Sequence, residues 1–101
     1  MGISVNISGD KKTATIKVNG RFDFSLHNEF RKSYKDVDMT SGQYLVDLSG
    51  TDYLDSSALG MLLLLKEQAD SQSCSVKLTG FTDEIKEILV IASFDKIFTL
   101  G

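Results

Sequence analysis

The sequence contains no proline, a single cysteine (Cys74) and a single histidine (His27). One cysteine excludes an intrachain disulfide, and we expect Cys74 to be a small core or edge residue of a strand. One histidine supplies no cluster of the ligands that metal sites need. The set nearest to a metal site is Asp47, Asp52 and Asp55, but turn and capping roles explain Asp52 and Asp55 equally well. We therefore expect neither a metal nor another cofactor.

Long hydrophobic runs and an excess of positive charge are also missing. The longest apolar run, Leu59–Leu65, is far shorter than the roughly 18 residues that cross a bilayer. Residues 1–6 lack the charged and apolar regions of a signal peptide, so we expect a cytoplasmic protein without membrane insertion. The net charge is −3 and the 11 Lys and Arg residues are scattered, which argues against a nucleic-acid-binding surface.

The first half of the chain shows two hydrophobic periodicities. Apolar and polar residues alternate over Ile3–Asn19 and predict a β-hairpin, which we expect to end at the break Asn19–Arg21. Apolar residues four apart then predict a helix over Ser25–Val37, capped by Asp23 or by its first serine. His27 lies beside the apolar stripe of this helix, so we expect it to face solvent, and Asp38–Gly42 is predicted to be a loop.

The central stretch couples a strand to a very apolar helix. Tyr44–Leu48 predicts a buried strand, and Ser49–Asp52 is a polar break typical of a turn. Asp55-Ser56-Ser57 then precedes a long apolar run and predicts a helix start. A helix this apolar is covered on most sides, either by the sheet or by a partner.

The last part of the chain continues the alternation of strands and helices. Cys74–Thr79 predicts a strand, Thr82 is placed to cap a third helix, and Ile97–Leu100 predicts a short terminal strand. The core face of the third helix is predicted to hold Ile85, Ile88, Leu89 and Ala92.

The whole pattern indicates an α/β domain spanning residues 1–101. The expected order is β-β-α-β-α-β-α-β, with an N-terminal hairpin, a mixed sheet, and helices that connect parallel strands by right-handed crossovers and pack on the sheet. At 101 residues with 42% hydrophobic content, the chain has enough apolar residues for one core.

The two serines at the central helix start allow two interpretations. A helix N-terminus presents unpaired N–H groups and a partial positive charge, which suit a phosphate or a hydroxyl that receives one. Asp-Ser-Ser before a helix is also the usual composition of an N-cap with no further role. If Ser56 were phosphorylated, it would gain about −1.5 to −2 charges beside Asp55 and, if the fold allows, Asp23. The added charge would change binding at a partner interface without large refolding of the domain.

Enzymatic alternatives find little support in these residues. A nucleophile elbow needs Gly-x-Ser-x-Gly with a following histidine, but His27 precedes both Ser56 and Ser57. A phosphate-binding loop needs a Gly-Lys-Ser/Thr sequence, which is absent. A receiver-type phospho-acceptor needs paired acids after the first strand, where only Asp10 stands. We expect a protein that is not an enzyme.

Two segments resemble a known family. The run Leu45-Val-Asp-Leu-Ser-Gly-Thr-Asp-Tyr-Leu-Asp-Ser-Ser-Ala-Leu-Gly60 resembles the signature of STAS domains, specifically of bacterial anti-sigma factor antagonists. Gly20-Arg-Phe-Asp23 resembles the Gly-x-hydrophobic-Asp segment that follows the second strand in that family. The predicted element order also agrees, so the resemblance covers nearly the whole chain.

The resemblance implies a partner-switching regulator of transcription. By position, Ser56 would be phosphorylated by an anti-sigma factor that is also a serine kinase of the histidine-kinase-like ATPase type. A PP2C-type phosphatase would remove the phosphate. Only the unphosphorylated form would bind the anti-sigma factor, and the free protein would be a monomer. Asp23, Asp55, Ser57, Ala58, Leu59 and Gly60 would surround the site, with Ala58 departing from the glycine of many members.

A second role is open within the same family. Some STAS proteins are not phosphorylated and serve as small constitutive subunits of an ABC lipid-transport complex or of a sensory assembly. In that case the apolar helix that begins at Ser56 would be a permanent docking element.

Overall fold

The computed structural model describes residues 2–37 and 42–101, so the loop predicted at Asp38–Gly42 lies outside this part of the chain except for its last residue. The order of elements confirms the predicted β-β-α-β-α-β-α-β pattern, with two short 3₁₀ helices added. The strands are β1 Ile3–Ile7, β2 Thr13–Phe22, β3 Gln43–Leu54, β4 Ser75–Thr79 and β5 Thr99–Leu100, and the helices are η1 Phe24–Leu26, α1 His27–Tyr34, α2 Ser56–Ser71, α3 Asp83–Ile91 and η2 Phe94–Lys96.

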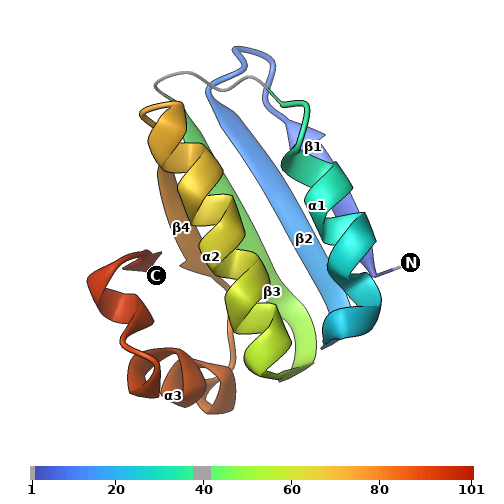
Figure 1. Ribbon diagram of the computed structural model, residues 1–101, viewed down its shortest axis with the longest axis vertical. Helices are drawn as coiled ribbons and strands as arrows, with labels where there is room; N and C mark the ends of the chain where they lie inside the picture. Colours follow the sequence, from blue (N-terminus) through green and yellow to red (C-terminus); the bar gives the residue numbers. More distant parts are fainter. Residues whose placement is uncertain (1, 38–41) are drawn as a thin grey trace.

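The five strands form one mixed sheet in the order β1-β2-β3-β4-β5. β1 pairs antiparallel with β2, as the predicted hairpin requires, and the later neighbours are all parallel. α1 and α2 lie side by side on one face of the sheet, and α3 lies beyond the end of β4 (Figure 1). Within the described residues no helix combines the length and the hydropathy needed to cross a bilayer.

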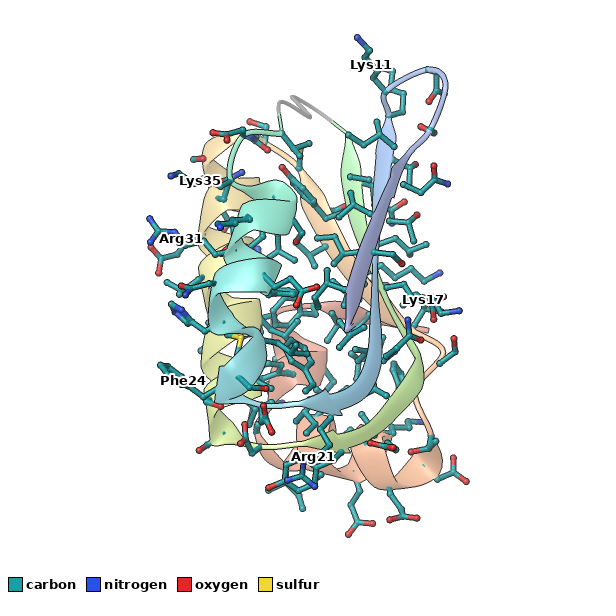
Figure 2. All side chains as sticks on the ribbon, turned by 90° about the vertical axis from the view of Figure 1, so that its right-hand side faces the viewer. Lys11, Lys17, Arg21, Phe24, Arg31 and Lys35 are labelled. Atoms are coloured by element: carbon teal, nitrogen blue, oxygen red, sulfur yellow. The ribbon has the colours of Figure 1, made fainter. Side chains whose placement is uncertain are left out.

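The core lies between the sheet and the two helices that cover it. Alternate side chains of the central strands point toward the helices and are fully buried, as the period-two pattern predicts. These are Ala14, Ile16 and Val18 of β2 and Tyr44, Val46 and Leu48 of β3. The opposite face carries polar side chains such as Lys17, which points away from the helices in Figure 2.

Two predicted breaks are in fact strand. Asn19–Arg21 belongs to β2 and Ser49–Asp52 belongs to β3, and the two segments pair with each other, Asn19 with Gly50. Two register shifts along this pairing accommodate Gly20, whose φ is +84°. The hydroxyl of buried Thr51 donates to the Val18 carbonyl over 2.9 Å, so a polar residue is satisfied within the sheet. These extensions carry both strands to the same edge of the molecule.

The predicted first helix is shorter than its periodicity suggested. Asp23 caps the 3₁₀ turn η1, and α1 follows it and ends at Tyr34 instead of Val37. Phe30 and Tyr34 are buried as the stripe predicted, and His27 is only half-exposed because its ring stacks on Phe24 at a centroid distance of 5.3 Å.

The later elements agree with the prediction except at one core position. Thr82 caps α3 by accepting a hydrogen bond from the Ile85 amide over 3.2 Å. Ile85 and Leu89 are buried and Ala92 packs partly against the core, but Ile88 is 36% exposed and does not belong to it. The reason is that α3 lies at the end of the sheet, so only a narrow stripe of it is covered. Cys74 is buried, as predicted.

Candidate functional site

The candidate site lies where β2 and β3 end next to each other. Phe22 pairs with Leu54 at the last rung of this parallel pairing, and each is followed directly by an aspartate. Because parallel strands end at the same edge of a sheet, Asp23 and Asp55 come together although they are far apart in sequence. The Gly-x-hydrophobic-Asp segment and the Asp-Ser-Ser segment are therefore parts of one site.

Both aspartates hold the same structural position. Asp55 caps α2, and its Oδ1 accepts the Ala58 amide over 3.1 Å and the Ser57 hydroxyl over 2.6 Å. Asp23 caps η1, and its Oδ1 accepts both the amide and the hydroxyl of Ser25, over 2.9 and 2.5 Å. Each strand thus turns into its helix through an acidic cap with an attached serine.

These hydrogen bonds fix the charge of the site. The Ser57 hydroxyl and then the Ala58 amide hold the pKa of Asp55 below its usual range. The hydroxyl and the amide of Ser25 lower the pKa of Asp23 in the same way. The charge of Asp23 acts on Asp55 in the opposite direction and raises its pKa, because two like charges are close to each other. Both carboxyls are ionised at neutral pH, and the site carries two negative charges.

The two candidate serines differ in their surroundings. Ser56 is the first residue of α2 and is exposed. In the part of the chain that the structure describes, its hydroxyl has no hydrogen-bond partner. Ser57 is half-buried and its hydroxyl is committed to Asp55. The Ser56 hydroxyl is therefore accessible from solution, whereas the Ser57 hydroxyl is part of the helix cap.

The remaining predicted site residues divide between core and surface. Ala58 is fully buried, so its side chain offers nothing to a partner, and half-buried Leu59 packs against the core. Gly60 is exposed, and a Cβ added there would meet no other atom within 4 Å. The exposed face of α2 continues from Gly60 to Leu63 and Leu64, which are 41% and 45% exposed.

Arg21, which was not among the predicted site residues, also lies next to the site. The Arg21 Nε lies 3.5 Å from Asp23 Oδ2, and its guanidinium carbon lies 3.9 Å from the centre of the Tyr53 ring. Arg21 and Tyr53 pair across β2 and β3. Side chains alternate along β2, so the burial of Phe22 places Arg21 on the opposite face of the strand. The sequence contains this alternation, but it can be used only if β2 is known to extend to Phe22.

The described residues contain no group of three or more His, Cys, Asp or Glu side chains that could hold a metal ion. Asp23 and Asp55 are both occupied as helix caps. A hollow of about 310 Å³ lies between the end of β3 and α3 and is lined by Asp52, Tyr53, Glu84 and Ile88 among others.

Comparison with known proteins places this geometry in a family. The family described as "Mlab, STAS domain" matches residues 5–100. A STAS-domain containing protein of Pseudomonas aeruginosa (strain UCBPP-PA14) is 42% identical over 101 residues, which is 100% of both chains.

Solved structures share the fold at low sequence identity. A candidate anti-sigma factor antagonist of Thermotoga maritima superposes with a TM-score of 0.82 at 18% identity, covering 97% of this chain and 84% of that chain. The anti-sigma factor antagonist SpoIIAA in its unphosphorylated form gives 0.68 at 12% identity, covering 94% and 96%. The phosphorylated form of the Bacillus SpoIIAA gives 0.69 at 11% identity, covering 98% and 90%.

Proposed function

The chain belongs to the STAS-domain family, and we propose that it is an anti-sigma factor antagonist, a non-enzymatic binding module controlled by phosphorylation of Ser56. We take residues 1–101 as one STAS domain that works in the cytoplasm. The unphosphorylated form binds an anti-sigma factor that is also a serine kinase of the histidine-kinase-like ATPase type, and binding releases the regulator which that partner holds. A PP2C-type phosphatase restores this form.

The contrast between the two serines carries the proposal. Ser56 is exposed at the first position of α2 and its hydroxyl has no partner in the described part of the chain, whereas Ser57 is bound to Asp55. A kinase needs a hydroxyl that can be reached without breaking the fold, and Ser56 meets this condition. SpoIIAA, which shares the fold, has a phosphorylated form, and this supports phosphorylation as the mode of control.

Charge explains how such a modification would act. The phosphate would add about −1.5 to −2 charges to a site that already holds the carboxylates of Asp23 and Asp55. The first amides of α2 would stabilise the phosphate locally, so the fold would not need to change. The added charge would face the partner, where an unmatched charge is costly. Gly60 and the exposed leucines of α2 would form the apolar part of the contact.

The first experiment is phosphopeptide mapping of the protein isolated from its native cells under several growth conditions. The tryptic peptide that ends at Lys66 contains both serines, and fragmentation separates them. We expect phosphate on Ser56 whose occupancy changes with condition, and none on Ser57. Unmodified peptide under every condition would contradict the proposal.

Variants test the consequence of the modification. Ser56→Ala should leave the fold unchanged and binding permanently on, and Ser56→Asp should weaken binding. Ser57→Ala is the matched control, because it removes a neighbouring hydroxyl that is committed to Asp55. Equal binding by wild type and Ser56→Asp would count against the charge mechanism.

One observation favours a second role. Leu63 and Leu64 are adjacent, 41% and 45% exposed, and lie in a run of four leucines in α2. Such a surface also suits permanent docking as a small subunit of an ABC lipid-transport or sensory complex. Stable co-purification with membrane ATPase subunits, unaffected by Ser56→Ala or Ser56→Asp, would favour this role over the phosphoswitch.

A further inference from the structure

A groove between α1 and α2 combines positive charge with exposed apolar side chains. It encloses about 470 Å³ and is lined by His27, Arg31 and Lys35 from α1 and by Leu64 and Glu67 from α2, among others. We call this surface, together with Phe24 at its end, the α1–α2 groove. It is separate from the hollow beside β3 and α3.

The basic side chains of the groove form a line along one helix. His27, Arg31 and Lys35 are four residues apart, so their side chains follow one face of α1 and its C-terminal end. Arg31 and Lys35 point away from the sheet, on the side of the molecule where Phe24 also lies (Figure 2). Neither makes an ion pair with another described residue, because the pairs found there are Arg21–Asp23 and Lys66–Asp70.

The local charge is opposite to that of the whole chain. The net charge is −3, yet the groove holds Arg31 and Lys35 against one acid, Glu67. Two exposed cations without acidic partners leave a positive potential at this position. They are too few to hold a nucleic-acid backbone, which requires many phosphate contacts.

Apolar side chains lie at the same surface. Phe24 is 69% exposed and stacks on His27, and Leu64 is 45% exposed on the opposite wall. An aromatic ring and a leucine that are both exposed cost free energy in water, and covering them by a partner is favourable. The groove therefore offers both an apolar contact and a charge contact.

We propose that the α1–α2 groove binds an acidic amphipathic segment of the protein partner. Apolar side chains of that segment contact Phe24 and Leu64, and its carboxylates face Arg31 and Lys35. This inference rests on the proposed function, since it describes the partner that the module binds. It assigns the chemistry of that partner, which the phosphorylation site alone does not.

The position of the groove also explains the effect of a phosphate. Ser56 and Leu64 are eight residues apart on α2, or about 12 Å along the helix axis. Phe24 follows Asp23 directly, at the same end of the molecule as Ser56. An acidic segment in the groove would approach Ser56 to roughly one Debye length, so a phosphate there would repel it.

The test begins with photo-crosslinking in the native cells. p-Benzoylphenylalanine replaces Leu64 in one variant, Leu63, which lies on α2 outside the groove, in a second, and Lys17 on the opposite sheet face as a control. We expect Leu64 and Leu63 to capture the same protein and the control to miss it. The captured peptide at Leu64 should be acidic, with apolar residues at helical spacing. A basic or uncharged peptide, or a second copy of this chain, would overturn the inference.

The captured partner is then purified and its affinity measured for two charge-reversal variants. Arg31→Glu/Lys35→Glu should weaken binding by about tenfold or more and reduce the salt dependence of association. Lys11→Glu/Lys17→Glu makes the same change in net charge away from the groove (Figure 2) and should change affinity less than about twofold. Equal effects of the two variants would overturn the inference.

The two proposals fail in different ways. If Leu63 captures a partner but Leu64 does not, the groove is not the contact and the proposed function is unaffected. If Leu64 captures an acidic segment while Ser56 is never phosphorylated, the groove inference holds and the switch does not. Capture at neither position refutes both.

Discussion

Ser57 and Asp55 are joined by a hydrogen bond in which the serine hydroxyl donates to the carboxylate over 2.6 Å. The same carboxylate oxygen accepts the Ala58 amide and so begins α2. Two neighbouring serines with the same chemistry are thereby given different surroundings. One completes the helix cap, and Ser56 is left exposed.

The Ser57 bond should be visible in the titration of Asp55. It is the largest cause that lowers the pKa of that carboxyl, so Ser57→Ala should raise the pKa of Asp55 toward its ordinary value. The measurement is a pH titration of the carboxyl carbon by NMR. Ser25→Ala is the matched control, since it should raise the pKa of Asp23 and leave Asp55 little changed. An unchanged Asp55 in Ser57→Ala would contradict the assignment of this bond.

Stability should depend on pH through the same two carboxyls. Asp23 and Asp55 both have a lowered pKa in the folded chain, so folding favours their ionised forms. Their contribution is fully present above the pKa of the unfolded chain, about 3.9, and is lost as the pH falls through the lower folded values. The free energy of unfolding of wild type relative to Asp55→Ala should therefore be constant from about pH 5 to 8 and shrink below about pH 4.

Urea unfolding at a series of pH values measures this difference. Asp52→Ala is a suitable control, because Asp52 is an exposed acid in the same segment that caps no helix. A difference between wild type and Asp55→Ala that grew on acidification would refute the capping role.

Gly80 should tolerate substitution poorly. Its φ is +77°, and an added Cβ would lie 2.8 Å from Asp47 Oδ1 and 3.0 Å from the Ser49 amide nitrogen. Gly80→Ala therefore combines backbone strain with a steric conflict beside β3, and we expect a loss of about 1–3 kcal/mol in the free energy of unfolding. Gly9→Ala, where a Cβ meets no atom within 4 Å, should change it by less than about 0.5 kcal/mol. Denaturant unfolding of both variants compares them, and equal losses would contradict this account.

The sequence predicted the parts of this fold that depend on local periodicity. Alternation predicted β2 and the apolar run Tyr44–Leu48 predicted the buried part of β3, and Asp23, Asp55 and Thr82 were predicted as caps or helix starts from their residue type and place. These features are set by residues close together in the chain. Local pattern was therefore enough to recover the element order.

The parts that failed depend on distant contacts. The polar segments Asn19–Arg21 and Ser49–Asp52 were predicted to be breaks between elements. In the structure they pair with each other through their backbones, and both are strand. No local signal records that pairing. The exposure of Ile88 likewise depends on α3 lying at the end of the sheet, where its partner surface is narrow.

The start of α2 was predicted, but the surroundings of its two serines were not. The spacing of Asp-Ser-Ser indicated a helix start with an available hydroxyl, but composition alone does not separate Ser56 from Ser57. The two serines differ because the first turn of α2 directs the Ser57 side chain, and not that of Ser56, toward the Asp55 carboxylate. The role of Arg21 was missed because its strand was expected to have ended.

Gly60→Ala gives a test in which stability and binding should move in opposite directions. Gly60 lies inside α2, where glycine is about 1 kcal/mol less favourable than alanine, and no neighbouring atom lies within 4 Å of an added Cβ. The free chain should therefore gain about 0.5–1 kcal/mol of stability. No contact within the described residues requires glycine here, and under the proposed function a partner backbone would approach this position closely. Alanine should thus weaken partner binding, while Gly9→Ala should not. Tighter binding by the stabilised Gly60→Ala chain would place the contact elsewhere on the surface.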